Sequence, residues 1–424
     1  MSERLEKREL TLGFVALLDC APLVIAQELG FFEQEGLQVS LSRESSWANV
    51  RDKVSYGLLD GAHMLAGMPI AATLGLGAPA LPMLTALSLN LGGNAITLSE
   101  QLCQRLLQTD PNALQQPVTT SRVLAQVIAE ARATAKKPMR FGMVFPVSSH
   151  HYLLRYWLRS GGIDPDRDVN IVVVPPAQMV SHLEAGIIQG YCVGEPWNTL
   201  AVAEGLGRLL MTSHAIWNNH PEKVFAVTRQ WAERHPQTHQ ALLRSLLKAC
   251  RWLDSTENRL AAVHILEKGR YVNTPAEILR AGLTGRWPTG SEPITTSQAA
   301  DDVLVFHRYA ANFPWRSHAL WFMAQMAACR QIEPDLDFSA LAAQVYRPDL
   351  YRQAAHTLGV VCPAVDSKVE GEHRTGWHCQ NASLTLGADR FLDDARFDPA
   401  AVRDYIQRQH GSLSRPTQHG EQPL

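Results

Sequence analysis

The feature of this sequence that most constrains its fold is a strand–helix–strand pattern that occurs twice. In the first copy, the apolar spacing predicts a strand, a helix and a strand over 10–17, 21–32 and 35–42. The second copy spans 139–175 and has the same order. Alternating elements of this length favour mostly parallel sheets with helices on their faces. We therefore expect an α/β fold made of two hinged lobes.

The chain has 424 residues, which is too long for one ordinary domain. After residue 230 the pattern becomes predominantly helical, and after residue 360 it becomes polar. We expect four parts, in chain order: the first part of lobe 1 over 1–98, lobe 2 over 99–222, a return to lobe 1 with a helical buttress over 223–360, and a C-terminal extension over 361–424. The last ten or so residues are polar, and we expect them to be disordered.

Composition and the first residues predict where the protein works. Lys plus Arg number 39 and Asp plus Glu 41, so no basic field indicates direct nucleic-acid binding. Seven cysteines without a CxxC pair argue against a disulfide framework and a zinc site. Charged residues fill positions 3–9, where an export signal would be apolar, and no apolar run is long enough to span a bilayer. We expect a cytoplasmic protein with no membrane attachment.

One candidate ligand residue opens the helix of the second copy. Ligands of α/β sheets bind beyond the carboxyl ends of strands, where helix N-termini present free N–H groups. His150 has this position and suits an anion, although an exposed histidine beside two capping serines fits the sequence as well. The pair His150–His151 suggests a metal ion, but neighbouring residues of a helix point in different directions. No metal ligand is predicted.

Four further residues combine a suitable position with suitable chemistry. Lys223 precedes an apolar strand and can supply a point charge, although the sequence alone favours a solvated loop lysine. Trp47, at a helix start, offers an N–H donor and a flat wall, yet a lone tryptophan is more often core. Asn94 follows two glycines that let the backbone come close to a ligand, although a Gly-Gly-Asn segment is more commonly a simple turn. Gly194 follows a buried strand and would expose a backbone N–H.

No catalytic motif is present. GxSxG, HExxH and P-loop patterns do not occur, and the glycine-rich segment 74–79 lacks the third glycine of a dinucleotide fingerprint. We therefore predict a protein that is not an enzyme and needs no cofactor.

Several segments together resemble a known family. They are GFVALLDCAPLVIAQELGFFEQEGL, SSWANVRDKVSYGLLDGAHMLAGMPIA, RYWLRSGGIDPD, VVVPP, VGEPWN and HPEKVFAV. The chain is similar, over about 10–360, to the nitrate and bicarbonate solute-binding proteins of cyanobacterial ABC importers and to their cytoplasmic relatives, the nitrate/nitrite sensors of the NasS family. The resemblance implies a type II periplasmic-binding-protein fold, with the ligand held between the lobes.

The resemblance also implies a binding site. The nitrate branch uses a tryptophan, a histidine, the glycine of VGEPW and the lysine of HPEK, which correspond to Trp47, His150, Gly194 and Lys223. Its glutamine corresponds to Asn94, which is one methylene shorter. The bicarbonate branch has an acidic residue in place of Lys223 and uses a metal ion. A lysine there implies a metal-free site for a monovalent anion.

A sensor of this family implies a protein partner as well as nitrate or nitrite. The partner is a NasT-like antiterminator of the ANTAR type, which binds RNA and is released when the anion arrives. The absent export signal favours this hypothesis over an extracytoplasmic component of an ABC nitrate importer. A third hypothesis is an enzyme like the thiamine pyrimidine precursor synthases, and it is disfavoured because the cysteines are dispersed.

Overall fold

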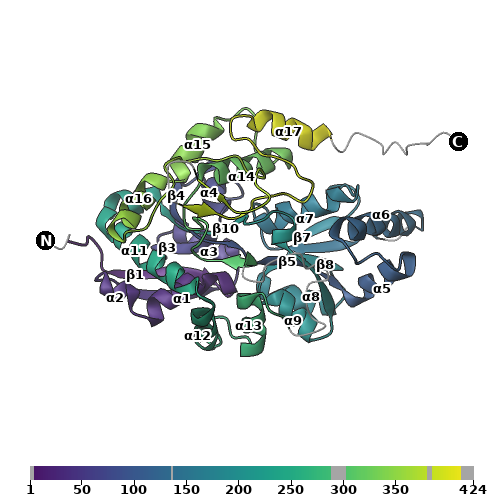
Figure 1. The fold of residues 1–424 in the computed structure, drawn as a ribbon, viewed down its shortest axis with the longest axis horizontal. Coiled ribbons are helices and arrows are strands. Elements are labelled where there is room, and N and C mark those ends of the chain that lie inside the picture. Colours follow the sequence, from purple (N-terminus) through teal and green to yellow (C-terminus); the bar gives the residue numbers. More distant parts are fainter. Residues whose placement is uncertain (1–3, 135–136, 288–301, 380–383, 412–424) are drawn as a thin grey trace.

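The computed structural model describes residues 4–134, 137–287, 302–379 and 384–411. Two lobes lie side by side, each built on one β-sheet with helices around it (Figure 1). The predicted two-lobed α/β fold is confirmed.

The sheet of the first lobe has six strands in the order β11–β4–β10–β3–β1–β2. Their bounds are β1 Glu9–Val15, β2 Gln38–Glu44, β3 Gly61–Leu65, β4 Met83–Gly92, β10 Pro221–Thr228 and β11 Leu304–Val305. β1 pairs in parallel with β2 and β3, whereas β10 runs antiparallel to β3 and β4. The helices that pack around this sheet, up to residue 284, are α1 Ala21–Glu28, α2 Phe31–Gln34, α3 Trp47–Ser55, α4 Met68–Leu74, α10 Arg229–Arg234, α11 Pro236–Leu253, α12 Thr256–Leu266 and α13 Ala276–Thr284.

The sheet of the second lobe has five strands in the order β7–β6–β8–β5–β9. Their bounds are β5 Asn94–Ser99, β6 Arg140–Met143, β7 Asn170–Val173, β8 Gly190–Gly194 and β9 Gly207–Thr212. The helices of this lobe are α5 Glu100–Thr109, α6 Pro117–Ala133, α7 Ser149–Ser160, α8 Met179–Glu184 and α9 Trp197–Ala203. β5 is antiparallel to both of its neighbours. Both sheets are therefore mixed, because β5 and β10 enter from the other lobe and run against the strands beside them.

The chain crosses between the lobes directly from β4 into β5. Gly92 and Gly93 have φ angles of +67° and +97°, and a Cβ on Gly92 would lie 2.5 Å from the Val303 carbonyl oxygen. Only glycine fits this backbone without strain. The strand that begins at Asn94 was expected to complete the first lobe, but it lies in the second sheet. Two apolar strands in succession do not show which sheet each one joins.

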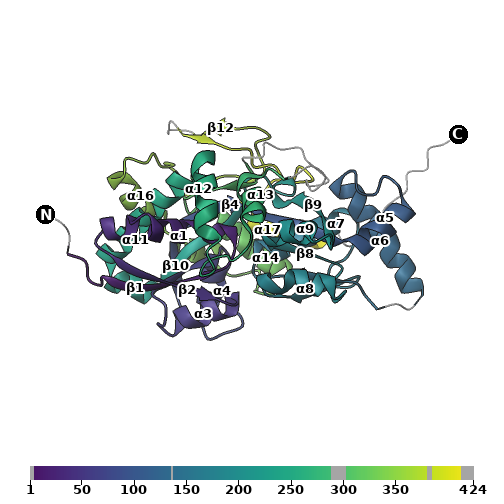
Figure 2. The ribbon, with the colours of Figure 1, turned by 90° about the horizontal axis from the view of Figure 1, so that it is seen from below.

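The chain after residue 302 packs along one side of the molecule. Helices α14 Arg316–Ala328, α15 Phe338–Val345 and α16 Pro348–Thr357 are followed by the short strands β12 Trp377–His378 and β13 Thr385–Leu386 and by α17 Val402–Gly411. Figure 1 shows α17 beside α14 at the upper edge, and Figure 2 shows β12 on the outer surface. The tail predicted to be disordered falls mainly in 412–424, outside the described residues. Within the described part of the chain, no helix combines the length and apolarity needed to cross a membrane.

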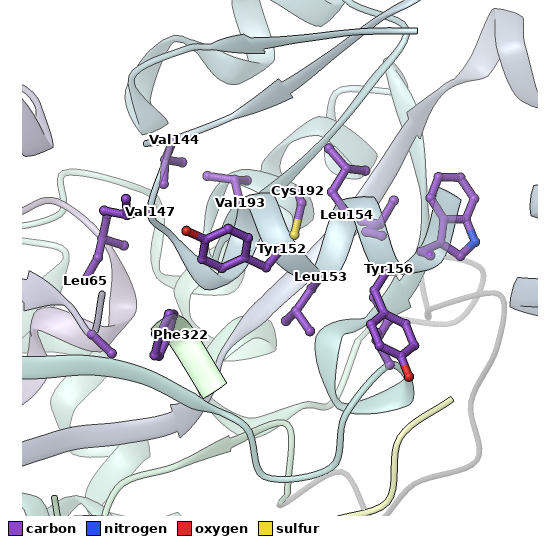
Figure 3. Close-up of a cluster of buried hydrophobic side chains, with 14 of the residues drawn as sticks. Leu65, Val144, Val147, Tyr152, Leu153, Leu154, Tyr156, Cys192, Val193 and Phe322 are labelled. Atoms are coloured by element: carbon purple, nitrogen blue, oxygen red, sulfur yellow. The ribbon is translucent and has the colours of Figure 1, made fainter. Parts of the chain in front are cut away.

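Apolar side chains of both lobes pack against one another. Figure 3 shows Tyr152 and Leu153 of α7 and Val193 of β8 in one buried cluster with Leu65 of β3 and Phe322 of α14. The rings of Tyr152 and Phe322 are 6.2 Å apart. The lobes are therefore closed on each other, and polar groups at their junction are removed from water.

Candidate functional site

The five predicted ligand residues come together at the junction of the lobes. Trp47 begins α3, Asn94 begins β5, His150 lies in the first turn of α7, Gly194 ends β8, and Lys223 lies in β10. All five are buried. Five elements from two lobes thus supply one polar cluster.

Among the described residues of this cluster, Lys223 is the one lysine or arginine, so its positive charge does not depend on the protonation of a histidine. Its Nζ lies 2.7 Å from Asp19 Oδ2, donates to Glu222 Oε1, and stands 5.5 Å from the centre of the Trp47 ring. Burial lowers the pKa of Lys223, but Asp19 and Glu222 raise it by more, so the ammonium persists. The interpretation of Lys223 as a solvated loop lysine is wrong.

Asp19 holds the second charge of the cluster. It lies in the short 3-10 helix Leu18–Cys20, directly after β1, and its Oδ1 is 2.9 Å from His63 Nε2. Burial raises the pKa of Asp19, but Lys223 and His63 lower it by more, so Asp19 is ionised. Burial lowers the pKa of His63, whose ring lies 5.2 Å from that of Trp47.

Glu222 links the two lobes. It accepts hydrogen bonds from Asn94 Nδ2 at 2.6 Å and from the Ser149 hydroxyl. His150 Nδ1 and His220 Nδ1 lie 3.5 and 3.8 Å from its two oxygens. Burial raises the pKa of Glu222, but His150, Lys223 and His220 lower it by more. Glu222 is therefore a buried carboxylate that contacts groups of both lobes.

His150 is buried, and neither of its ring nitrogens has a hydrogen-bond partner among the described residues. The alternative of an exposed histidine is wrong. Of the two serines, Ser148 caps the helix, because it accepts from the His151 N–H at 3.1 Å, whereas the Ser149 hydroxyl donates to Glu222. Burial lowers the pKa of His150 to about 4. His151 turns away and places Nδ1 2.7 Å from the Pro146 carbonyl oxygen. The two imidazoles therefore do not form a metal pair.

Gly194 and Asn94 face each other across the β5–β8 ladder. A Cβ on Gly194 would lie 3.2 Å from Leu17 Cδ2, 3.4 Å from Asn94 Oδ1 and 3.6 Å from Asp19 Oδ2. Glycine thus leaves space beside these polar atoms. Asn94 gives an amide N–H to Glu222, and in the part of the chain that the structure describes its Oδ1 is buried without a partner, as is Trp47 Nε1. Buried polar atoms are normally hydrogen-bonded, so these atoms mark a place where a small polar ligand would complete the structure.

Five members of this group were not found in the sequence: Asp19, His63, Ser149, His220 and Glu222. We call them, with the five predicted residues, the inter-lobe cluster. A histidine inside an apolar strand was a usable signal for His63. Glu222 was not predicted to share a site with Lys223, because adjacent residues of a strand normally point to opposite faces of the sheet. The β10–β4 register shifts on both sides of Lys223, and this irregularity lets Glu222 and Lys223 serve the same site.

The described side chains offer binding groups and not a reactive thiol. Burial raises the pKa of every cysteine: Cys20, Cys103, Cys192, Cys250, Cys329, Cys362 and Cys379. A thiol with a raised pKa is a poor nucleophile at neutral pH. In the described ranges, no group of three or more His, Cys, Asp or Glu side chains has an arrangement that could hold a metal ion.

Comparisons with known proteins agree with this architecture. Residues 3–267 match the NMT1-like family. The chain is 41% identical over 406 residues to the nitrate import ATP-binding protein NrtC of Synechocystis sp. PCC 6803, covering 95% of this chain and 55% of that protein. It thus spans about half the length of that relative. It is 31% identical over 408 residues to the nitrate/nitrite binding protein NrtA of Nostoc sp. PCC 7120, covering 95% and 86%.

The fold also matches a solved structure. The crystal structure of the periplasmic nitrate-binding protein NrtA from Synechocystis PCC 6803 superposes with a TM-score of 0.82 at 29% identity, covering 96% of this chain and 99% of that one. This confirms the predicted periplasmic-binding-protein fold. Proteins named for bicarbonate transport or binding match at 40% and 30% identity, so overall similarity does not separate the two anions.

Proposed function

Because the chain belongs to the NMT1-like family, we propose that its inter-lobe cluster binds nitrate or nitrite and that the protein is a cytoplasmic sensor of this anion. The observation that carries the proposal is Lys223, a buried ammonium at the junction of the lobes. Trp47 and His150 add buried polar atoms that have no partner among the residues the structure describes, and Gly194 leaves space beside Asn94 and Asp19.

These features suit a small monovalent oxyanion. Nitrate spreads its charge over three weakly accepting oxygens, so its recognition needs a desolvated cation and several donors. Lys223 is such a cation, and Trp47 supplies an N–H and a flat wall beside it. Because the cluster is buried, the lobes must separate for the anion to enter. Binding would then favour the closed arrangement.

The sensor role needs a partner that prefers one arrangement of the lobes. We propose a NasT-like antiterminator of the ANTAR type, which the ligand-free protein would hold and the anion-bound protein would release. The similarity to an ATP-binding import protein supports the cytoplasmic assignment, because ATP that drives import is cytoplasmic. The chain is more similar to that protein, at 41% identity, than to the nitrate/nitrite binding protein, at 31%.

A co-purification experiment tests the sensor role. The antiterminator should be retained on the immobilised protein in anion-free buffer and released by nitrate or nitrite, but not by chloride at equal ionic strength. A Gly194→Ala variant should hold the partner and release it only at higher nitrate concentration. Retention that nitrate and nitrite leave unchanged would refute the sensor role and leave the binding site untouched.

A second candidate function is the solute-binding component of an ABC-type nitrate importer. The superposition on the periplasmic nitrate-binding protein favours it, because the same site would serve both roles. Fractionation of cells that produce the protein from its own locus separates the two. The sensor proposal expects it with cytoplasmic markers, and recovery with extracytoplasmic markers supports the importer.

The nature of the anion needs its own test. A ligand that binds only the folded protein raises its melting temperature. Nitrate or nitrite should raise it in metal-free buffer, since Lys223 supplies the positive charge. A rise seen only with bicarbonate and calcium together would replace the nitrate proposal.

A further inference from the structure

The inter-lobe cluster already contains more negative than positive charge before any anion enters. Asp19 and Glu222 have lowered pKa values and are therefore carboxylates at pH 7, and both contact the ammonium of Lys223. His63, His150 and His220 have lowered pKa values because they are buried, so they are neutral at pH 7. An anion that entered alone would add a second uncompensated negative charge to a buried site, which is strongly unfavourable.

A proton that accompanies the anion removes this difficulty, and the geometry indicates where it goes. The charged and titratable groups around His150 are Glu222, Lys223 and His220 of β10 and the segment before it, Asp19 after β1, and the thiol of Cys192 in β8 near the same carboxylate. Both ring nitrogens of His150 lack hydrogen-bond partners within the described ranges, and Nδ1 lies 3.5 Å from Glu222 Oε1. An imidazolium has two N–H donors, one for Glu222 and one for the anion.

Resting on the proposed function, we propose that Glu222 is a positioning residue that makes anion binding proton-coupled: each anion enters with one proton, which His150 holds between Glu222 and the anion. Glu222 is suited to this role because Ser149 and Asn94 fix its Oε2, while Oε1 faces His150. The Asn94 amide nitrogen donates to Glu222 at 2.6 Å and to the Ser149 hydroxyl at 3.4 Å. Asn94 therefore helps to position Glu222.

The proposal gives a definite pH dependence. In the closed arrangement without an anion, burial lowers the pKa of His150 to about 4, and an anion beside the ring would raise it, so the bound state holds more protons over the interval between these values. Affinity is then greatest at low pH and weakens as pH rises. Uptake of one proton corresponds to a Kd that rises about tenfold per pH unit.

Calorimetric titration of the full chain with sodium nitrate, in buffers of different ionisation enthalpy, counts the protons directly. Nitrate is the right probe because it is not protonated at these pH values, so any proton taken up resides on the protein. We expect close to one proton per nitrate at pH 6 to 7. Glu222→Gln and His150→Asn should each reduce this number well below one and flatten the pH dependence of Kd. Glu130→Gln, an exposed change in α6, should behave as wild type.

The outcomes separate the two proposals. Nitrate binding without proton uptake in the wild type would overturn the coupling and leave the proposed function standing. Uptake that Glu222→Gln does not change would overturn the role of Glu222. No binding of nitrate or nitrite at any pH would overturn the proposed function, and the coupling with it. If either variant fails to fold, the buffer dependence of the wild type still decides whether a proton is taken up.

Discussion

The ammonium of Lys223 has two tasks, because it compensates two buried carboxylates and offers charge to an anion. Removing one member of a buried charge group leaves the others uncompensated and costs about 3–5 kcal/mol. Lys223→Ala should therefore lower the free energy of unfolding by about that amount and abolish measurable nitrate binding. Urea denaturation and calorimetry measure the two effects. Lys268→Ala removes a half-exposed ion pair with Glu28 and should cost no more than about 1 kcal/mol.

The substitution Gly194→Ala tests whether the ligand occupies the space beside the inter-lobe cluster. A methyl group there would press on Leu17 at 3.2 Å and occupy the volume beside Asn94 and Asp19. Gly194→Ala should therefore weaken nitrate binding by about tenfold or more, equal to about 1.4 kcal/mol, while the free energy of unfolding changes by less than about 1.5 kcal/mol. Gly269→Ala, whose Cβ would meet only Asn273 at 3.4 Å, should leave affinity unchanged. Equal affinities for the two variants would place the ligand elsewhere.

At the residue level the sequence allowed only part of the site to be predicted. The position of His150 after a strand was informative. For Lys223, the family resemblance favoured a ligand residue over a solvated loop lysine. Glu222 was missed because a register shift in β10 decides its direction, and such a shift depends on pairing with β4. The orientation of the Asn94 amide was likewise out of reach, because Glu222 sets it from another lobe.

Among the elements, the crossing from β4 to β5 determines how the lobes meet. The two glycines there bring the backbone against Val303, whose carbonyl accepts from the Gly93 N–H at 2.7 Å. The strands on each side were predicted, but their assignment to separate sheets was not. The chain direction after the crossing also explains why both sheets are mixed and not parallel.

Gly92→Ala tests the crossing. The change imposes a left-handed backbone on alanine and a clash with the Val303 oxygen at 2.5 Å. Gly57 offers a matched control, since it has φ +69° and nothing within 4 Å of its Cβ position. Backbone strain alone costs about 1 kcal/mol, so Gly57→Ala should lose about that much. Gly92→Ala should lose at least twice as much in chemical denaturation, and equal losses would show that the close approach has no importance.

In the whole molecule, the C-terminal extension packs against both lobes, and Leu386 joins the apolar core of the first lobe. Phe391 stacks on Trp217, which lies between β9 and β10, with ring centres 4.6 Å apart, and on Tyr156 of α7. Tyr156 also donates to Asp393, and Gln325 of α14 contacts Tyr405 of α17. The sequence left open whether these last residues pack or extend into solvent, because their composition is polar and contacts of such long range leave no local pattern.

Phe391→Ala tests the importance of the extension. Removal of a fully buried aromatic ring costs about 3–5 kcal/mol through lost burial and the cavity that remains. Denaturation should show a single transition at lower urea concentration, since the extension is part of the common core. Leu336→Ala, at a partly exposed position, should change stability by less than about 1 kcal/mol. A loss of less than about 1 kcal/mol in Phe391→Ala would mean that the extension is not integral to the fold.

The central claim is that a single anion is held at the junction of the lobes by Lys223. A crystal structure of the protein grown in saturating potassium nitrate tests it most directly. We predict flat, three-lobed density within hydrogen-bonding distance of Lys223 Nζ, with His150 and Trp47 also in contact. Closed lobes with only water at Lys223, or nitrate bound solely at other positions, would contradict the claim.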